Sequence, residues 1–334
     1  MGEFSRIAVI GGGAWGTAVA LAALRAGRDA VLWAREPAVV EAINRDHENR
    51  DYLPGVPLPA ALTATGDDSV VAGADAVMLV APAQHLRTVC QRLAPHWKPG
   101  APAVICAKGI EIATQSLMSE AVAAALPAGT PVAVLSGPTF AAEVARGLPT
   151  AVTLACTDTV LGARLVESLG SRTFRPYLSG DVIGAQVGGA VKNVLAIACG
   201  VVEGRTLGDN ARAALITRGL AEITRLALAL GGRAETLMGL SGLGDLTLTC
   251  SSLQSRNMSL GAALGAGRTL DEVLGERRSV AEGVYTARAV VALAGRLGVD
   301  MPICAAVDAI LNHGAGLDDA IAALLARPFR EEKH

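Results

Sequence analysis

Residues 6–16, which read R-I-A-V-I-G-G-G-A-W-G, decide the fold. The first five form an apolar run that is too short for a helix and suited to a buried parallel strand. Gly11, Gly13 and Gly16 follow at once, and residues 17–26 have a helical pattern. This order is the context of a dinucleotide-binding turn, because glycines let backbone N–H groups approach a pyrophosphate at a helix N-terminus. The alternative is a tight turn that binds nothing.

The end of the next strand bears on the choice of cofactor. Residues 29–34 complete a β-α-β unit, and Arg35 and Glu36 follow Ala34. Sites selective for NAD place an acid here to bind the ribose 2′-hydroxyl, whereas an arginine can face the 2′-phosphate of NADP. Arg35 therefore favours NADP(H), and NAD(H) stays open as a second cofactor. The alternative for Arg35 is a solvated surface arginine.

The alternation of strands and helices continues to about residue 177. We expect further strands over residues 75–81, 103–107, 131–135, 151–155 and 173–177. Lys108 follows one of these strands directly, and ligands in open α/β sheets bind at the carboxyl ends of the strands. The loop S-G-P-T-F-A at residues 136–141 could offer backbone N–H groups to an oxygen-rich ligand. A solvent-facing lysine and plain turn chemistry are the alternatives.

The strand pattern ends at residues 178–181, which we take as a domain boundary. Helical patterns then cover residues 182–203, 210–230, 234–238, 255–265, 270–274, 282–297, 303–311 and 317–325. Alanine is frequent in them and has high helix propensity. The sequence therefore predicts an α/β Rossmann-type domain over residues 1–181, followed by an all-α substrate-binding domain over residues 182–334.

The first helix of the second half carries a lysine in apolar surroundings. Residues 182–202 are long enough to span a membrane, but Lys192 near the bilayer centre would cost roughly 2.5–3.5 kcal/mol. We expect a buried helix and no membrane span. Desolvation lowers the pKa of a buried lysine, which suits it to acid–base chemistry near neutral pH. The alternative is a lysine whose stem packs while its amine reaches water.

A polar cluster follows in the second half. Asp245 lies in G-L-G-D-L, and Ser255, Arg256 and Asn257 come soon after it. A guanidinium beside hydroxyl and amide groups at a helix start is a reasonable phosphate site. Asp245 could accept a hydrogen bond from a substrate hydroxyl or hold a lysine. Otherwise Ser255 is only a helix cap and Arg256 a surface cation.

Composition excludes several classes of protein. The chain has 334 residues, enough for about two domains, and a net charge of -2 argues against a nucleic-acid partner. The cysteines are widely separated and the histidines have no ligand spacing, so we expect reduced thiols and no metal site. We expect no secretory leader, because the residues before the first strand lack a charged segment followed by an apolar one. We therefore expect a cytoplasmic protein.

Six motifs in one order resemble a known family. They are G-G-G-A-W-G-T-A near the N-terminus, C-A-K-G-I-E at 106–111, S-G-P-T-F-A-A-E-V at 136–144, G-G-A-V-K-N-V at 188–194, G-L-G-D-L at 242–246 and S-R-N at 255–257. Together they resemble the bacterial-type NAD(P)-dependent glycerol-3-phosphate dehydrogenases, over about residues 6–326. The resemblance implies a helical domain like that of 6-phosphogluconate dehydrogenase, a homodimer and a role in glycerophospholipid synthesis.

The resemblance also implies roles for individual residues. The catalytic residues would be Lys192, Lys108 and Asp245. The substrate, dihydroxyacetone phosphate or sn-glycerol 3-phosphate, would be bound by Lys108, Gly137, Thr139, Lys192, Asp245, Ser255, Arg256 and Asn257. The cofactor would be bound by Gly11, Gly13, Ala14, Trp15, Gly16, Arg35, Lys108, Ala141, Arg256, Val280 and Glu282. Many members have serine in place of Ala14, and Ala281 stands where a branched apolar residue is common, which weakens the assignment of Val280.

The chemistry expected of these residues is reduction of a ketone. The cofactor would bring the hydride, Lys192 the proton, and Lys108 would stabilise negative charge on the oxygen. Arg256 and Asn257 would anchor the phosphate. Two other functions stay open. One is a related dehydrogenase of 2- or 3-hydroxy acids or ketopantoate, and the other is an NAD(P)H sensor without turnover.

Overall fold

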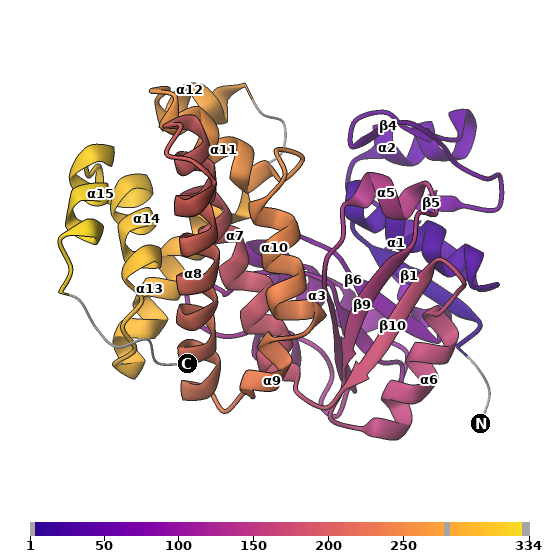
Figure 1. Cartoon of the computed structure of the whole chain (residues 1–334). Helices are drawn as coiled ribbons and strands as arrows, with labels where there is room; N and C mark the ends of the chain where they lie inside the picture. The colour runs from indigo at the N-terminus through magenta and orange to yellow at the C-terminus, as the bar shows by residue number, and fades with distance from the viewer. Residues whose placement is uncertain (1–3, 277–280, 329–334) are drawn as a thin grey trace.

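The computed structural model describes residues 4–276 and 281–328, and it consists of a sheet half and a helical half (Figure 1). The strands in this part of the chain are β1 (Arg6–Ile10), β2 (Asp29–Trp33), β3 (Glu48–Asn49), β4 (Leu53–Pro57), β5 (Thr63–Thr65), β6 (Ala76–Leu79), β7 (Ala103–Ile105), β8 (Val132–Ser136), β9 (Thr150–Ala155) and β10 (Phe174–Ser179). The α-helices among them are α1 (Ala14–Arg25), α2 (Pro37–Glu41), α3 (Leu86–Leu93), α4 (Met118–Ala123), α5 (Ala141–Ala145) and α6 (Thr159–Leu169).

The helical half follows β10 without returning to the sheet (Figure 1). Its helices are α7 (Val182–Gly204), α8 (Asp209–Ala229), α9 (Ala234–Leu237), α10 (Asp245–Cys250), α11 (Arg256–Gly265), α12 (Leu270–Gly275), α13 (Glu282–Leu297), α14 (Pro302–His313) and α15 (Leu317–Leu325). A short π-helix, η5 (Leu240–Gly244), leads directly into α10. Figure 1 shows α14 and α15 at the end of the molecule that is farthest from the sheet.

The main sheet has the order β10-β9-β8-β7-β6-β1-β2-β5. β1 lies between β2 and β6 and is parallel to both, so the order of the chain reverses at this strand. β7 and β8 continue in the same direction, whereas β9 is antiparallel to β8. The carboxyl ends of β1, β7 and β8 therefore meet at one edge of the sheet, where ligands of such sheets bind.

The sequence of β1 explains its central position. Ile7 and Val9 belong to the core on one face of the sheet, and Ala8 and Ile10 belong to the core on the other face. These four residues are at most 1 % exposed. A strand that is buried on both faces must be apolar throughout, as this one is.

Helix α7 is the centre of the helical half and packs against α8, α10, α11, α13 and α14. By length and composition it could cross a membrane, but 89 % of its most apolar window is buried inside the protein. Gly200 and Gly261 lie where α7 crosses α11, and a Cβ on either would overlap a backbone carbonyl oxygen of the other helix. The two backbones therefore approach closely, which small residues permit.

The fold class expected from the sequence is confirmed, with local differences. α1 begins at Ala14, three residues before the expected start, because Gly13 is its N-cap. The strands β3, β4 and β5 were not predicted, since each is short and β4 reads L-P-G-V-P, without alternation. α10 was not among the predicted helices, because its sequence D-L-T-L-T-C alternates polar and apolar residues and does not show helical periodicity.

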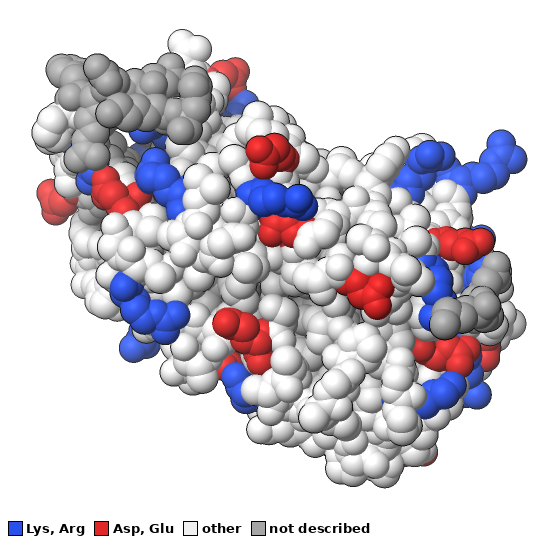
Figure 2. Space-filling view, turned by 90° about the horizontal axis from the view of Figure 1, so that it is seen from below, with Lys and Arg blue, Asp and Glu red and all other residues white. Residues whose placement is uncertain are grey.

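Charged side chains are sparse on the face drawn in Figure 2. Basic and acidic residues lie interspersed on this face, among larger areas of uncharged surface. This distribution agrees with the net charge of -2 for the whole sequence. A field of one sign, such as would steer a highly charged polymer, does not develop over this face.

Candidate active site

Lys192 projects from the middle of α7 and is 6 % exposed. Its Nζ donates hydrogen bonds to Asp245 Oδ1 at 2.5 Å and to Thr249 Oγ1 at 2.9 Å. Burial lowers the pKa of this ammonium from 10.5 to about 8; the Asp245 carboxylate opposes that change, and the positive charge of Lys108 adds to it. An amine with this pKa can give or take a proton near neutral pH.

Lys108 follows β7 and approaches the same carboxylate from the sheet half. Its Nζ lies 2.8 Å from Asp245 Oδ2 and donates to the carbonyl oxygen of Gly137 at 2.9 Å. Thr139 Oγ1 is at 3.5 Å, the limit of a hydrogen bond. Asp245 is fully buried and therefore holds one amine from each half of the chain. The three groups together carry a net positive charge, which favours a substrate that is an anion or becomes one.

A glycine on α7 lets Asp245 reach both lysines. A Cβ on Gly188 would overlap the carbonyl oxygen of Ser241 in η5. Because this side chain is absent, η5 packs directly on α7 and delivers Asp245 as the first residue of α10. Thr249 lies four residues after Asp245, one turn later on α10, so both side chains face the Lys192 amine.

The expected phosphate cluster forms part of the joint between α7, α11 and α13. Asn257 Nδ2 donates to Asn193 Oδ1 at 3.0 Å, and Asn257 Oδ1 accepts from the N–H of Gly283 at 3.0 Å. Ser255 caps α11 by accepting a hydrogen bond from Met258 N at 3.2 Å. One N–H of the Asn257 amide and the hydroxyl hydrogen of Ser255 are not used by these bonds. Both side chains can therefore still donate to an anion.

Glu282 connects the two halves of the chain beside this cluster. Its Oε1 accepts a hydrogen bond of 3.3 Å from the N–H of Ala83 in the sheet half. Burial raises the pKa of its carboxyl, and the charge of Arg256 opposes that change, which places the guanidinium near this carboxyl. Glu282 therefore ties the start of α13 to the sheet half, and the positive charge of Arg256 acts on its carboxylate. Val280 lies outside the described residues.

The glycine turn after β1 has the shape that a pyrophosphate requires. Gly11 has φ of +133°, and a Cβ on Gly16 would overlap the carbonyl oxygen of Gly11. Space above Gly13 is open, and the N-terminus of α1 has no side-chain cap. The indole Nε1 of Trp15 is buried and has no hydrogen-bond partner in the described part of the chain. Open backbone N–H groups and an unused donor fit the phosphates of a dinucleotide.

The other expected cofactor residues lie at strand ends and helix starts. Arg35 follows β2, its side chain is 74 % exposed, and it pairs with Glu36 at 2.8 Å. Ala14 and Ala141 are the first residues of α1 and α5. Arg35 is thus open to solvent at the position where the ribose 2′-substituent is read.

Two polar residues of the site were missed in the sequence analysis. Thr249 binds the Lys192 amine, and Asn193 binds Asn257. The spacing of Asp245 and Thr249 would have identified Thr249, had residues 245–250 been recognised as a helix. Asn193 lies beside Lys192 in the sequence, but only the packing of α11 against α7 shows its partner.

Comparison with known proteins decides the family. The N-terminal family profile, described as NAD-dependent glycerol-3-phosphate dehydrogenase N-terminus, matches residues 6–161, and the corresponding C-terminus profile matches residues 181–322. The chain belongs to the NAD-dependent glycerol-3-phosphate dehydrogenase family. As a member of this family it is an oxidoreductase that uses NAD(H) or NADP(H), and the expectation from the six motifs is confirmed.

Individual relatives support the same assignment to glycerol-3-phosphate dehydrogenase. The glycerol-3-phosphate dehydrogenase (NAD(P)+) of Rhodospirillum rubrum is 65 % identical over 327 residues, which cover 98 % of this chain and 93 % of that protein. The crystal structure of glycerol-3-phosphate dehydrogenase from Coxiella burnetii has a TM-score of 0.93 at 40 % identity, covering 97 % of this chain and 99 % of that one. The structure of a ketopantoate reductase from Ralstonia eutropha has a TM-score of 0.58 at 18 % identity. This likeness shows only that the two chains share a fold.

Proposed function

We propose that this glycerol-3-phosphate dehydrogenase reduces dihydroxyacetone phosphate reversibly to sn-glycerol 3-phosphate for glycerophospholipid synthesis. Bound NAD(P)H supplies the hydride. Lys192 donates a proton to the C2 oxygen of the ketone, and in the reverse direction it takes this proton from the alcohol. The observation that carries the proposal is the meeting of Lys192 and Lys108, one from each half, on the buried carboxylate of Asp245.

Each member of this triad has a separate task. Asp245 orients both amines, and its negative charge keeps the Lys192 pKa from falling as far as burial alone would drive it. Lys108 stabilises the negative charge that develops on the C2 oxygen before the proton arrives. With a pKa of about 8, Lys192 is mostly protonated at neutral pH, as the reduction requires.

The substrate phosphate is placed between the triad and the start of α11. Arg256 forks to two phosphate oxygens, with donors from Ser255 and Asn257 beside it. Gly137 and Thr139 hold the other end of the substrate next to Lys108. Supporting this placement, Arg256 lies near Glu282 at the border of the two halves. The substrate ketone is then held over the edge of the sheet.

The cofactor is proposed to lie along the sheet edge. Gly11, Gly13, Trp15 and Gly16 hold its pyrophosphate, with Ala14 and Ala141 at the two adjoining helix starts. Glu282, Arg256 and Lys108 border its nicotinamide end. Arg35 contacts the 2′-phosphate, so NADP(H) is preferred over NAD(H). Residues 1–181 thus act as the cofactor domain and residues 182–334 as the substrate domain.

A coupled assay with dihydroxyacetone phosphate, run with NADH and NADPH in parallel, tests this function. Loss of absorbance at the nicotinamide band with either cofactor supports it, and its absence with both refutes it. Inorganic phosphate should compete with the substrate, because the Arg256 cluster is proposed to hold a phosphate. A substrate that is a 2-hydroxy acid would not show this competition.

We also propose a cytoplasmic homodimer. The six cysteines are free and buried, as suits a reducing compartment. Apolar side chains such as Leu228, Met238 and Leu253 are exposed on the helical half, and such surface often marks a contact between chains. Light scattering on the purified protein measures the mass, and a monomer at micromolar concentration would refute the dimer.

A further inference from the structure

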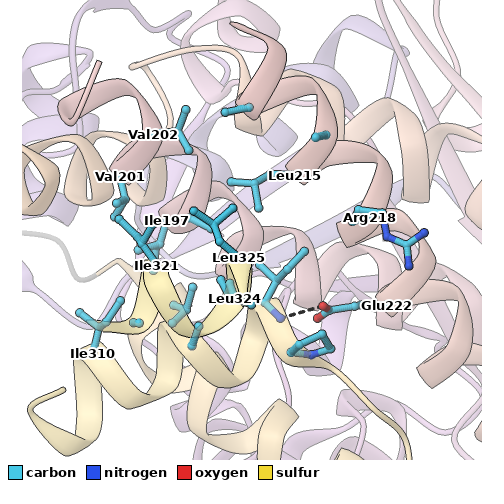
Figure 3. Close-up of a pocket in the computed structure, with 18 of the residues that line it drawn as sticks. Ile197, Val201, Val202, Leu215, Arg218, Glu222, Ile310, Ile321, Leu324 and Leu325 are labelled. Atoms are coloured by element: carbon cyan, nitrogen blue, oxygen red, sulfur yellow. Dashed lines mark hydrogen bonds between the residues drawn. The ribbon is translucent and has the colours of Figure 1, made fainter. Parts of the chain in front are cut away.

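A large cavity lies within the helical half, and its lining includes neither lysine of the active site. Its volume is about 1230 Å³, and α7, α8, α14 and α15 form its walls. Figure 3 shows side chains from these helices, among them Ile197, Leu215, Ile310 and Leu324, directed toward a common space. We refer to this space as the aliphatic cavity.

The lining of the aliphatic cavity indicates the kind of ligand that it can accept. Its apolar lining side chains are alanine, valine, leucine, isoleucine and proline, and the described lining has no aromatic ring. Flat ligands usually stack on aromatic side chains, which this lining lacks. Leu207 and Leu325, which line the cavity, are 48 % and 82 % exposed. Uncovered aliphatic surface of this kind fits a flexible alkyl chain.

Most charged groups of the lining already have partners within the protein. Arg225 donates two hydrogen bonds to the carbonyl oxygen of Asp300, and Arg327 pairs with the Asp300 carboxylate at 2.6 Å. The Glu222 carboxylate accepts the N–H of Ile303 at 2.7 Å, at the start of α14. Arg225 and Glu222 therefore hold α8 to the segment at the start of α14, and Arg327 joins the end of the described chain to the same segment.

Arg218 differs from these charged groups. It lies one turn before Glu222 on α8, lines the cavity, and has no hydrogen bond or ion pair with any residue in the described ranges. The Glu222 carboxylate accepts the N–H groups of Ile303 and Cys304, and it makes no ion pair with this guanidinium within the described ranges. Figure 3 shows Arg218 at one end of the group of aliphatic side chains. A guanidinium at this position can bind a carboxylate with two parallel hydrogen bonds.

We propose that the aliphatic cavity binds a long-chain fatty acid. Its alkyl chain lies among the side chains of α7, α14 and α15, and its carboxylate pairs with Arg218. Each additional methylene that the cavity buries should strengthen binding about fourfold. The affinity should therefore rise from laurate to palmitate and oleate. This inference does not depend on the proposed catalytic roles, because binding is measured without turnover.

Calorimetric titration of the full chain with oleate, below the concentration at which oleate forms micelles, tests the proposal. Arg218→Ala should weaken oleate binding about tenfold or more, since a hydrogen-bonded charge pair is lost. The same variant should bind oleyl alcohol, which is uncharged, as the wild type does. Arg296→Ala, on the exposed face of α13 and outside the cavity, is the matched control and should bind oleate normally.

A second variant tests the place of the alkyl chain. Ala306 lines the cavity from α14, and Ala306→Trp should fill the space and abolish binding of both oleate and oleyl alcohol. A thermal melt of this variant checks that it is folded. The proposal is overturned if oleate does not bind, if Arg218→Ala binds it normally, or if affinity is independent of chain length. It is also overturned if Ala306→Trp leaves oleate binding intact while converting a dimer to a monomer, because the cavity would then be an interface between copies.

Discussion

Replacing Asp245 with asparagine should change the pH at which Lys192 titrates. The Asp245 carboxylate accepts hydrogen bonds from the two amines at 2.5 and 2.8 Å and is fully buried. Removing an opposite charge at this range lowers the pKa of a lysine by roughly one to three units. The Lys192 pKa, about 8 in the wild type, should therefore fall to roughly 5–7 in Asp245→Asn.

The assay is kcat/KM for oxidation of glycerol 3-phosphate, measured as a function of pH, since this constant reports the free enzyme. The wild type should lose activity below about pH 8, where Lys192 is protonated and cannot act as the base. In Asp245→Asn this loss should move to lower pH. At pH 7 the reduction should be impaired in the variant, because Lys192, the proton donor, is then mostly deprotonated.

Thr249→Val is the comparison variant. It removes a neutral hydrogen-bond partner of Lys192 and leaves the carboxylate in place, so the pH profile should move little. Asp245→Asn should also lower the free energy of unfolding by about 3–5 kcal/mol, as measured in urea, because a buried pair of charges loses one partner. If kcat/KM of Asp245→Asn still falls below about pH 8, as in the wild type, the Asp245 carboxylate does not raise the pKa of Lys192 as proposed.

The active site was only partly accessible to sequence reasoning. The glycine turn could be predicted because its residues are contiguous and each has a local steric reason. Lys192 could be singled out because an amine within an apolar helix is costly. The sequence left open whether Asp245 holds a lysine or a substrate hydroxyl, since Asp245 is 53 residues away and reaches Lys192 only through the packing of η5 on Gly188. Long-range packing of this kind leaves no periodic signal in the chain.

The phosphate cluster shows a second limit of sequence reasoning. Ser255 and Asn257 were chosen as ligands for a phosphate, and both also have structural tasks. Ser255 caps α11, the role that the sequence offered as the alternative to phosphate binding. Asn257 joins α11 to α7 and α13. A short polar motif gives no sign of this double use. Similarly, β3, β4 and β5 escaped prediction because none of them is a continuous apolar run: they read E-N, L-P-G-V-P and T-A-T.

Three further predictions follow from the same structure. Arg35→Ala should raise KM for NADPH about tenfold or more and leave KM for NADH nearly unchanged, which steady-state kinetics with both cofactors measures. Gly261→Val should destabilise the fold by about 3 kcal/mol or more in urea, because its Cβ would overlap the carbonyl oxygen of Ile197; Gly275→Ala, with open space around it, should have little effect. The folded-state pKa of Lys192 lies below its ordinary 10.5, so the unfolded chain binds more protons between about pH 8 and 10.5. Stability should therefore gain about 3 kcal/mol across this window, and urea titrations of Lys192→Met should lack this gain.

The central claim is that the buried amine of α7 moves the proton in the reaction. The most direct measurement is the single-turnover rate of dihydroxyacetone phosphate reduction by Lys192→Ala, with NADPH affinity determined on the same sample. We predict that the rate falls about 100- to 10,000-fold while cofactor affinity stays close to that of the wild type. A variant that binds NADPH normally and keeps most of the rate would contradict the claim.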